Sequence, residues 1–274
     1  MSLPVLCINL AGATRRWESI QHQVLRSLPD ASLQRIEAVA WPDLPPDLPG
    51  VSLFTRYLIQ VPDAQRTHRC SHRQLDTVSS VAILLSHIRC WEWLIAGKAP
   101  YALILEDDAC FDAGFPDVWA TQVQPLLRDP SAWDCLVLGY FSPAGPETPA
   151  PLLGVPLIRV VQFFGAHAYI LTRQGAQVFM RHAFPVDHHS DGMMLTLHEL
   201  GLLRLYLLPH SVISQCLDGV DRLGSWHTHT TMTMTSVTTL INSMPTWTDS
   251  MPAWTVLVVV IAFVALLGYL LRRA

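Results

Sequence analysis

Short apolar runs that alternate with helical segments constrain the fold of this chain more than any other feature of its sequence. The runs predicted to form strands are Leu3 to Asn9, Leu33 to Val39, Tyr101 to Leu105, Asp134 to Leu138, Leu157 to Phe163, Ala168 to Leu171 and Leu203 to Leu208. Helices are expected at Thr14 to Leu28 and Thr77 to Ala96, and again after Phe115, Thr172 and Asp191. Alternating strands and helices are typical of a mostly parallel sheet in one layered α/β domain.

The length of 274 residues suits one such domain with an appendage. We expect the domain to span residues 1–226, followed by a tether at 227–252 that is rich in Thr, Ser, Met and Pro and has no periodicity. Residues 253–274 are predicted to form a transmembrane tail anchor. Within them Trp254 to Leu271 carries no charge, and as a helix it would be ~27 Å long, enough to cross a hydrocarbon core.

The N-terminal residues do not resemble a secretory signal, so the folded domain is expected on the cytosolic side of a single-pass membrane protein. The terminal pair Arg272 and Arg273 argues the other way, because the positive-inside rule keeps such charges in the cytosol. The net charge of -4 predicts no nucleic-acid partner. Six cysteines without paired spacing are expected to be reduced.

Three consecutive carboxylates, Glu106, Asp107 and Asp108, follow the predicted strand that begins at Tyr101. Ligands of open α/β sheets bind at the carboxyl ends of the strands, and clustered negative charges repel unless a cation lies among them. This pattern suits a hard divalent cation that carries a diphosphate. The alternative interpretation is a polar loop after a buried strand.

Six segments occur in the order found in glycosyltransferase family 25, which includes bacterial lipopolysaccharide and collagen galactosyltransferases. They are "CINLAGATRRWESI" (7–20), "LLSHIRCWEWLI" (84–95), "YALILEDDACF" (101–111), "WDCLVLGYF" (133–141), "GAHAYILTRQGAQ" (165–177) and "PVDHHSDGMM" (185–194). The chain therefore resembles that family from about Leu3 to Gln215. The segment "AVAWPDLPPDLPG" (38–50) departs from the family pattern, and this puts the choice of donor in doubt.

The resemblance implies a GT-A type fold, a UDP-sugar donor with galactose favoured, Mn²⁺ or Mg²⁺ as cofactor, and inversion at the anomeric carbon. Its donor and cofactor residues fall on Asn9, Leu10, Arg15, Arg16, Ser86, His87, Glu106 and Asp107. Its metal ligands fall on Glu106, Asp108 and Asp187, and a further motif falls on Gly165, His167 and Tyr169.

An inverting transfer also needs a carboxylate that takes the proton of the acceptor hydroxyl. Asp187 and Asp191 are the candidates, and Asp187 is favoured because a carboxylate at the start of a helix, as at Asp191, is stabilised by the helix dipole alone. Asp187 could serve as the base or as a metal ligand. The predicted function is hexose transfer to a glycan, lipid-linked or protein acceptor. The alternative is a membrane-tethered binding module without turnover.

Overall fold

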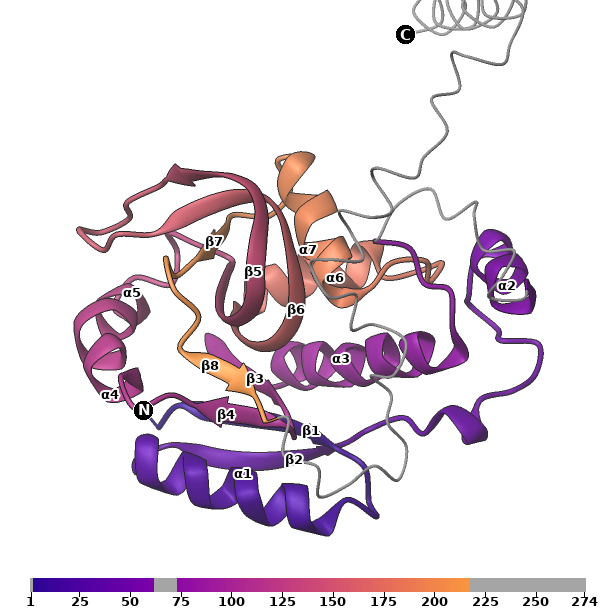
Figure 1. Ribbon diagram of the computed structural model, residues 1–274, viewed down its shortest axis with the longest axis horizontal. Coiled ribbons are helices and arrows are strands. Elements are labelled where there is room, and N and C mark those ends of the chain that lie inside the picture. Colours follow the sequence, from indigo (N-terminus) through magenta and orange to yellow (C-terminus); the bar gives the residue numbers. More distant parts are fainter. Residues whose placement is uncertain (1, 62–72, 217–274) are drawn as a thin grey trace, which may run out of the picture. The chain divides into compact units, whose positions relative to one another are not determined.

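The computed structural model describes residues 2–61 and 73–216, and all of them lie in one compact unit (Figure 1). The predicted tether (227–252) and tail anchor (253–274) lie outside the described residues. Within these ranges, one helix, Val78–Ala96, is long and apolar enough to cross a membrane. Half of the apolar stretch of this helix is buried inside the protein, as in the core helix of a globular domain.

A six-stranded sheet forms the centre of the domain, in the order β2-β1-β3-β6-β5-β7. Its strands are β1 (Pro4–Asn9), β2 (Ser32–Glu37), β3 (Tyr101–Glu106), β5 (Cys135–Pro149), β6 (Ile158–Thr172) and β7 (Leu205–Leu207). Strands β1, β2 and β3 pair in parallel, as do β5 and β7, while β6 runs antiparallel to both of its neighbours. The prediction of a mixed α/β fold with a mostly parallel sheet is therefore confirmed.

Helices cover both faces of this sheet (Figure 1). One face packs against α3 (Val78–Ala96), α6 (Arg173–His182) and α7 (Ser190–Glu199). The other packs against α1 (Thr14–Ser27) and against the run made by α4 (Phe115–Val118), η3 (Trp119–Val123) and α5 (Gln124–Leu127). Alternate residues of each strand enter opposite cores, because strand side chains point to the two faces in turn.

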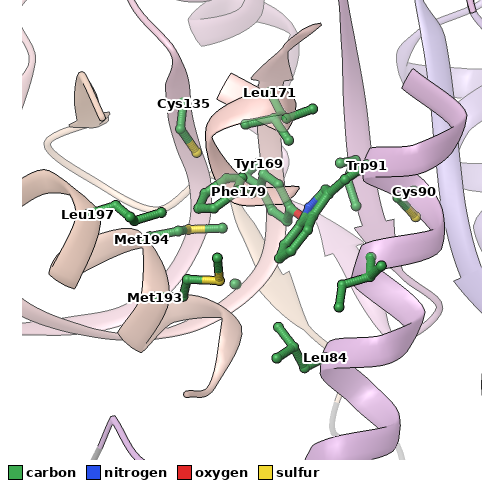
Figure 2. Close-up of a cluster of buried hydrophobic side chains, with 14 of the residues drawn as sticks. Leu84, Cys90, Trp91, Cys135, Tyr169, Leu171, Phe179, Met193, Met194 and Leu197 are labelled. Carbon is green, nitrogen blue, oxygen red and sulfur yellow. The ribbon is translucent and has the colours of Figure 1, made fainter. Parts of the chain in front are cut away.

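Helix α3 lies in the core, and its buried apolar side chains explain its membrane-like composition. Its side chains Trp91 and Leu94 are fully buried, and the Trp91 ring stacks on Phe179 of α6 with 4.7 Å between centroids (Figure 2). The helix begins after Thr77, whose hydroxyl accepts from the Ser80 amide and so caps the first turn. The predicted bounds of this helix are correct to one residue.

Strand β6 differs from the prediction of two separate strands. Residues 164–167 continue the strand, and β6 pairs with β5 along a long ribbon that contains several register shifts. Gly165 in this bridging stretch has a φ of 85°, a conformation that favours glycine. A glycine and a histidine between two apolar runs signal a break, but here they mark a distortion of one strand.

Two short strands and two shorter helices are absent from the prediction. Strands β4 (Ala109–Phe111) and β8 (Ile213–Gln215) form a separate antiparallel pair. Helix α2 (Leu53–Gln60) and the short helix η1 (Trp41–Asp43) lie between β2 and α3. Three-residue strands are too short to show periodicity, so the pairing of β4 with the distant β8 could not be predicted from the sequence.

The cysteine prediction is wrong for one pair. Cys110 in β4 and Cys216 after β8 form a disulfide, with a Cα–Cα distance of 5.4 Å. Cys7, Cys90 and Cys135 are free and buried, as predicted for reduced thiols. The two bonded cysteines are 106 residues apart, so their spacing carries no signal of pairing.

Candidate active site

The three consecutive carboxylates lie where the chain leaves the central sheet. Glu106 is the last residue of β3, Asp107 and Asp108 form the turn, and β4 begins at Ala109. Strand β1 is parallel to β3 and ends at Asn9, so the carboxyl ends of two central strands meet here. The predicted position of the carboxylates at the end of a strand is correct.

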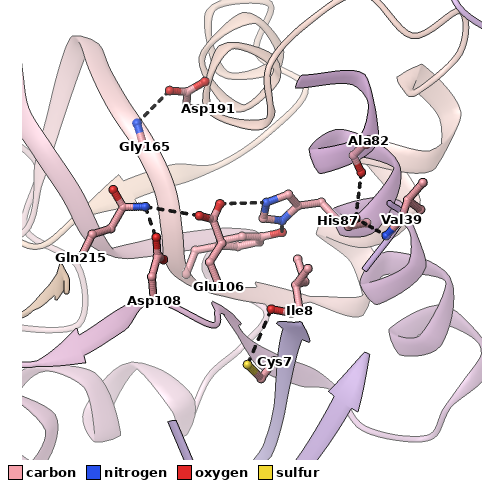
Figure 3. Close-up of polar contacts among 12 residues, drawn as sticks. Cys7, Ile8, Val39, Ala82, His87, Glu106, Asp108, Gly165, Asp191 and Gln215 are labelled. Carbon is pink, nitrogen blue, oxygen red and sulfur yellow. Dashed lines mark hydrogen bonds and ion pairs between the residues drawn. The ribbon is translucent and has the colours of Figure 1, made fainter. Parts of the chain in front are cut away.

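Gln215 of β8 joins the outer two carboxylates. Its side-chain amide nitrogen lies 3.3 Å from Glu106 Oε2 and 3.5 Å from Asp108 Oδ1 (Figure 3). The backbone amide of Cys216 donates to the Asp108 carbonyl at 2.7 Å, and the disulfide joins the same two strands. Glu106 and Asp108 thus converge on one donor that comes from the far end of the domain. No motif or periodic pattern in the sequence marks Gln215 as a site residue.

The other oxygen of Glu106 faces α3. His87 Nε2 lies 3.4 Å from Glu106 Oε1 (Figure 3), and His87 Nδ1 lies 2.9 Å from the hydroxyl of Tyr169. The indole nitrogen of Trp91 donates to that hydroxyl, also at 2.9 Å. His87, Trp91 and Tyr169 are all fully buried. The structure therefore brings two residues of the family motifs, His87 and Tyr169, to the first carboxylate.

Asp107 has different partners from the other two carboxylates. Its oxygens accept from Asn9 Nδ2 at 2.6 Å and lie 3.0 Å from Arg16 Nη1. Burial raises the pKa of Asp107 to about 6, against the opposing effect of Arg16 and Asn9. The predicted donor residues Asn9 and Arg16 thus hold Asp107, while the buried atoms Asn9 Oδ1 and Arg16 Nε lack a hydrogen-bond partner among the described residues.

Three other predicted donor residues have different surroundings. Ser86 is buried, and its hydroxyl donates to the Ala82 carbonyl and accepts from the Val39 amide, so it ties α3 to the loop after β2. The backbone carbonyl of Leu10 accepts from Arg35, and Arg15 is exposed in the first turn of α1. The structure places Ser86 as a packing residue.

The two candidates for the catalytic base differ sharply. Both oxygens of Asp191 are used by backbone amides. Gly165 donates to Oδ2 at 2.8 Å (Figure 3), and Gly192 donates to Oδ1 at 2.7 Å. Asp191 therefore fastens the start of α7 to β6. The side chain of Asp187 is 44% exposed and pairs through Oδ1 with His188 Nδ1. The side chain of Asp187 is thus accessible to solvent.

His167 of β6 is a structural residue behind the site. Its Nε2 lies 2.7 Å from the Ile213 carbonyl, which can only accept, so Nε2 carries the proton. Gly139 of β5 makes room for this contact, since a Cβ there would lie 2.5 Å from His167 Nε2 and 2.6 Å from the Ile213 oxygen. His167 thereby holds β8, and with it Gln215, against the main sheet.

The predicted metal ligands are brought together only in part. Glu106 and Asp108 share Gln215, whereas Asp187 pairs with His188 instead. Within residues 2–61 and 73–216, no group of three or more His, Cys, Asp or Glu side chains is placed to hold a metal ion. Oxygen ligands are those that Mg²⁺ and Mn²⁺ prefer, so the pair Glu106 and Asp108 has the chemistry that such a cation requires.

A family model described as "Glycosyltransferase family 25 (LPS biosynthesis protein)" matches residues 2–132, which include β1, α3 and all three carboxylates. Over these residues the chain is similar to glycosyltransferase family 25. This match supports the family that the sequence motifs indicate, and with it the general class of glycosyltransferase.

One curated relative from Homo sapiens, named "Inactive glycosyltransferase 25 family member 3", is 24% identical over 144 residues. The match covers 50% of this chain and 24% of that protein, so the chain spans about a quarter of the relative's length. A crystal structure of S. aureus TarS (residues 1–349) aligns with a TM-score of 0.37 and 10% identity, over 78% of this chain and 60% of that one. A likeness at that level carries no argument about function.

Proposed function

We propose that this chain is a metal-dependent, inverting hexosyltransferase that takes its sugar from UDP-hexose, with galactose favoured. The observation that carries the proposal is the convergence of Glu106 and Asp108 on Gln215 at the end of β3. An amide nitrogen held by two carboxylates marks a position that favours positive charge, and a small divalent cation is the stronger occupant. The GT-A type of fold belongs to the same proposal.

Mn²⁺ or Mg²⁺, held by Glu106 and Asp108, would supply charge that stabilises the departing diphosphate. The chain's own contribution is to orient these two carboxylates, through Gln215 on one side and His87 on the other. In the transfer, the bond between the sugar C1 and the diphosphate oxygen breaks as the acceptor oxygen forms a bond to C1. Asp187 is the proposed base that takes the acceptor proton, because Asp191 already accepts two backbone hydrogen bonds.

The test measures UDP release from a panel of UDP-hexoses and glycan acceptors, with Mn²⁺ and with a chelator. Glu106→Gln and Asp108→Asn should lose Mn²⁺-dependent release while melting near the wild-type temperature. Glu92→Gln serves as control, because Glu92 is an exposed carboxylate on the outer side of α3. Full activity in both site variants would rule out the metal assignment.

A binding module without turnover is the second candidate, and the relative that is named inactive favours it. The two candidates differ in a simple measurement. A binding module would be stabilised against heat by Mn²⁺ and UDP-sugar through mass action, but it would release no UDP with any acceptor. An enzyme would show both effects.

Membrane attachment through residues 253–274 is part of the proposal. Disulfides persist mainly in oxidising compartments, so the bond between Cys110 and Cys216 argues for a domain outside the cytosol, as does the terminal arginine pair. The cytosolic placement predicted from the N-terminal sequence is therefore the less favoured side. Protease protection of intact membrane vesicles, read at the catalytic domain, distinguishes the two sides.

A further inference from the structure

The buried side chains behind Glu106 form a continuous series of hydrogen bonds. It runs from the Trp91 indole to the Tyr169 hydroxyl, on to His87 and finally to Glu106. The first three side chains are fully buried, so water does not compete for their polar atoms. Each atom in the series can therefore be assigned as donor or acceptor by counting protons.

The count begins at Trp91, whose indole nitrogen can only donate. The Tyr169 hydroxyl accepts that bond and has one proton of its own. Among the described contacts of this hydroxyl, His87 Nδ1 at 2.9 Å is the other nitrogen within reach. If His87 Nδ1 carried a proton, the hydroxyl would accept twice and its own buried proton would have no acceptor, which is costly.

We infer that Trp91 and Tyr169 fix His87 in the tautomer that bears its proton on Nε2 and aims that N–H at Glu106. Tyr169 is then a positioning residue for the first carboxylate of the site, although it does not touch Glu106. The Nε2 to Glu106 Oε1 distance of 3.4 Å is the longest of the series, which leaves the carboxylate able to turn toward a ligand. The tautomer rests on the hydrogen-bond count alone, and the positioning role rests on the proposed function.

The position of the proton on His87 affects the carboxylate of Glu106. A protonated Nε2 donates to Glu106 and favours its ionised form, whereas a bare Nε2 would repel it. Residues that orient metal-binding groups from behind typically change metal affinity or activity by about 10- to 100-fold when they are removed. Tyr169 should therefore influence Mn²⁺ binding from a fully buried position.

The first measurement is the tautomer itself. Long-range ¹H–¹⁵N correlation spectra of the full chain, labelled at histidine and free of metal, distinguish Nδ1–H from Nε2–H imidazole. We expect the wild-type His87 signals to show the Nε2–H form. A wild-type Nδ1–H form would overturn the inference without any variant.

The second measurement is Mn²⁺ affinity by titration calorimetry in Tyr169→Phe, with Tyr140→Phe as the matched control. The Tyr140 hydroxyl is also buried and donates to the Leu208 carbonyl at 2.7 Å, so its removal costs a comparable hydrogen bond away from Glu106. Tyr169→Phe should bind Mn²⁺ roughly 10- to 100-fold more weakly and show a mixed His87 tautomer, while Tyr140→Phe should match wild type in both.

Equal Mn²⁺ affinity in the two variants would overturn the positioning role. If wild type shows the Nε2–H form and binds no Mn²⁺, the proposed function fails while the tautomer assignment stands. Should Tyr169→Phe fail to fold, Trp91→Phe replaces it, since that variant keeps the Tyr169 hydroxyl and its proton. That proton still needs His87 Nδ1 as its acceptor, so His87 should keep the Nε2–H form, and an Nδ1–H form would contradict the count.

Discussion

Replacing Gly139 with alanine should destabilise the domain and disturb the site at once. Gly139 lies in β5 beside His167 and the carbonyl of Ile213, which are joined by a hydrogen bond of 2.7 Å. A Cβ at this position would lie 2.5 Å from His167 Nε2 and 2.6 Å from that carbonyl oxygen. One of these contacts is to backbone, so the clash cannot be relieved by turning a flexible side chain.

The size of the effect follows from two terms. Forcing an extra methyl group into a packed core costs about 1 to 3 kcal/mol. Separating His167 from Ile213 leaves buried polar atoms without partners, which costs about 1 to 3 kcal/mol more. For a domain of this size, each kcal/mol lowers the melting temperature by roughly 2 to 4 °C. Gly139→Ala should therefore melt roughly 10 °C below wild type.

Thermal unfolding followed by circular dichroism measures this shift, and Gly114→Ala is the matched control. Gly114 has a φ of -81° at the start of α4, and a Cβ there would meet nothing within 4 Å. The control should melt at or slightly above the wild-type temperature. If Gly139→Ala also melts within about 2 °C of wild type, the close approach of these strands is not what holds β8.

Three further predictions concern charges and the disulfide. Because burial raises the pKa of Asp107 to about 6, the folded state keeps a proton that the unfolded chain has released, so stability falls as pH rises from about 4 to about 6. In urea unfolding without metal, Asp107→Asn should reduce this pH-dependent loss of unfolding free energy by up to about 3 kcal/mol. If the unfolding free energies of wild type and variant depend on pH in the same way, the prediction is wrong. Asp187→Asn should lower transfer by ~10²-fold at an unchanged melting temperature. Asp191→Asn should instead lower the melting temperature, since it loses an acceptor of two backbone amides, and the reverse pattern would exchange their roles. Cys216→Ser opens a link across 106 residues and should cost about 4 kcal/mol under non-reducing conditions, whereas equal melting temperatures would deny the bond a stabilising role.

The parts of the fold that the sequence predicted are those with long periodic patterns. The helix at Val78–Ala96 has an apolar stripe over five turns, and the strand at Tyr101–Glu106 is an uninterrupted apolar run before charges. Such patterns depend on residues close together in the chain. The same holds for the location of Glu106 and Asp108, because a strand end can be recognised locally.

The contacts that complete the candidate site are not local. Gln215 is 109 residues from Glu106 and lies in a three-residue strand without any pattern of its own. Asp107 looks like its two neighbours in sequence, yet the turn aims it at Asn9 and Arg16. The direction of a side chain in a turn depends on backbone geometry that composition does not encode. Equally, the pairing of Cys110 with Cys216 follows from the β4 and β8 register.

The disulfide also determines how mechanical force on the later part of the chain would reach the site. Force applied beyond Cys216 enters the described domain at that residue, next to Gln215. Without a covalent link, the antiparallel pair of β4 and β8 would open one residue at a time from this end, and Gln215 would be the first to leave Glu106 and Asp108. With Cys216 bonded to Cys110, the load passes directly into β4. The carboxylates and their amide therefore keep their arrangement while the chain that follows them is pulled.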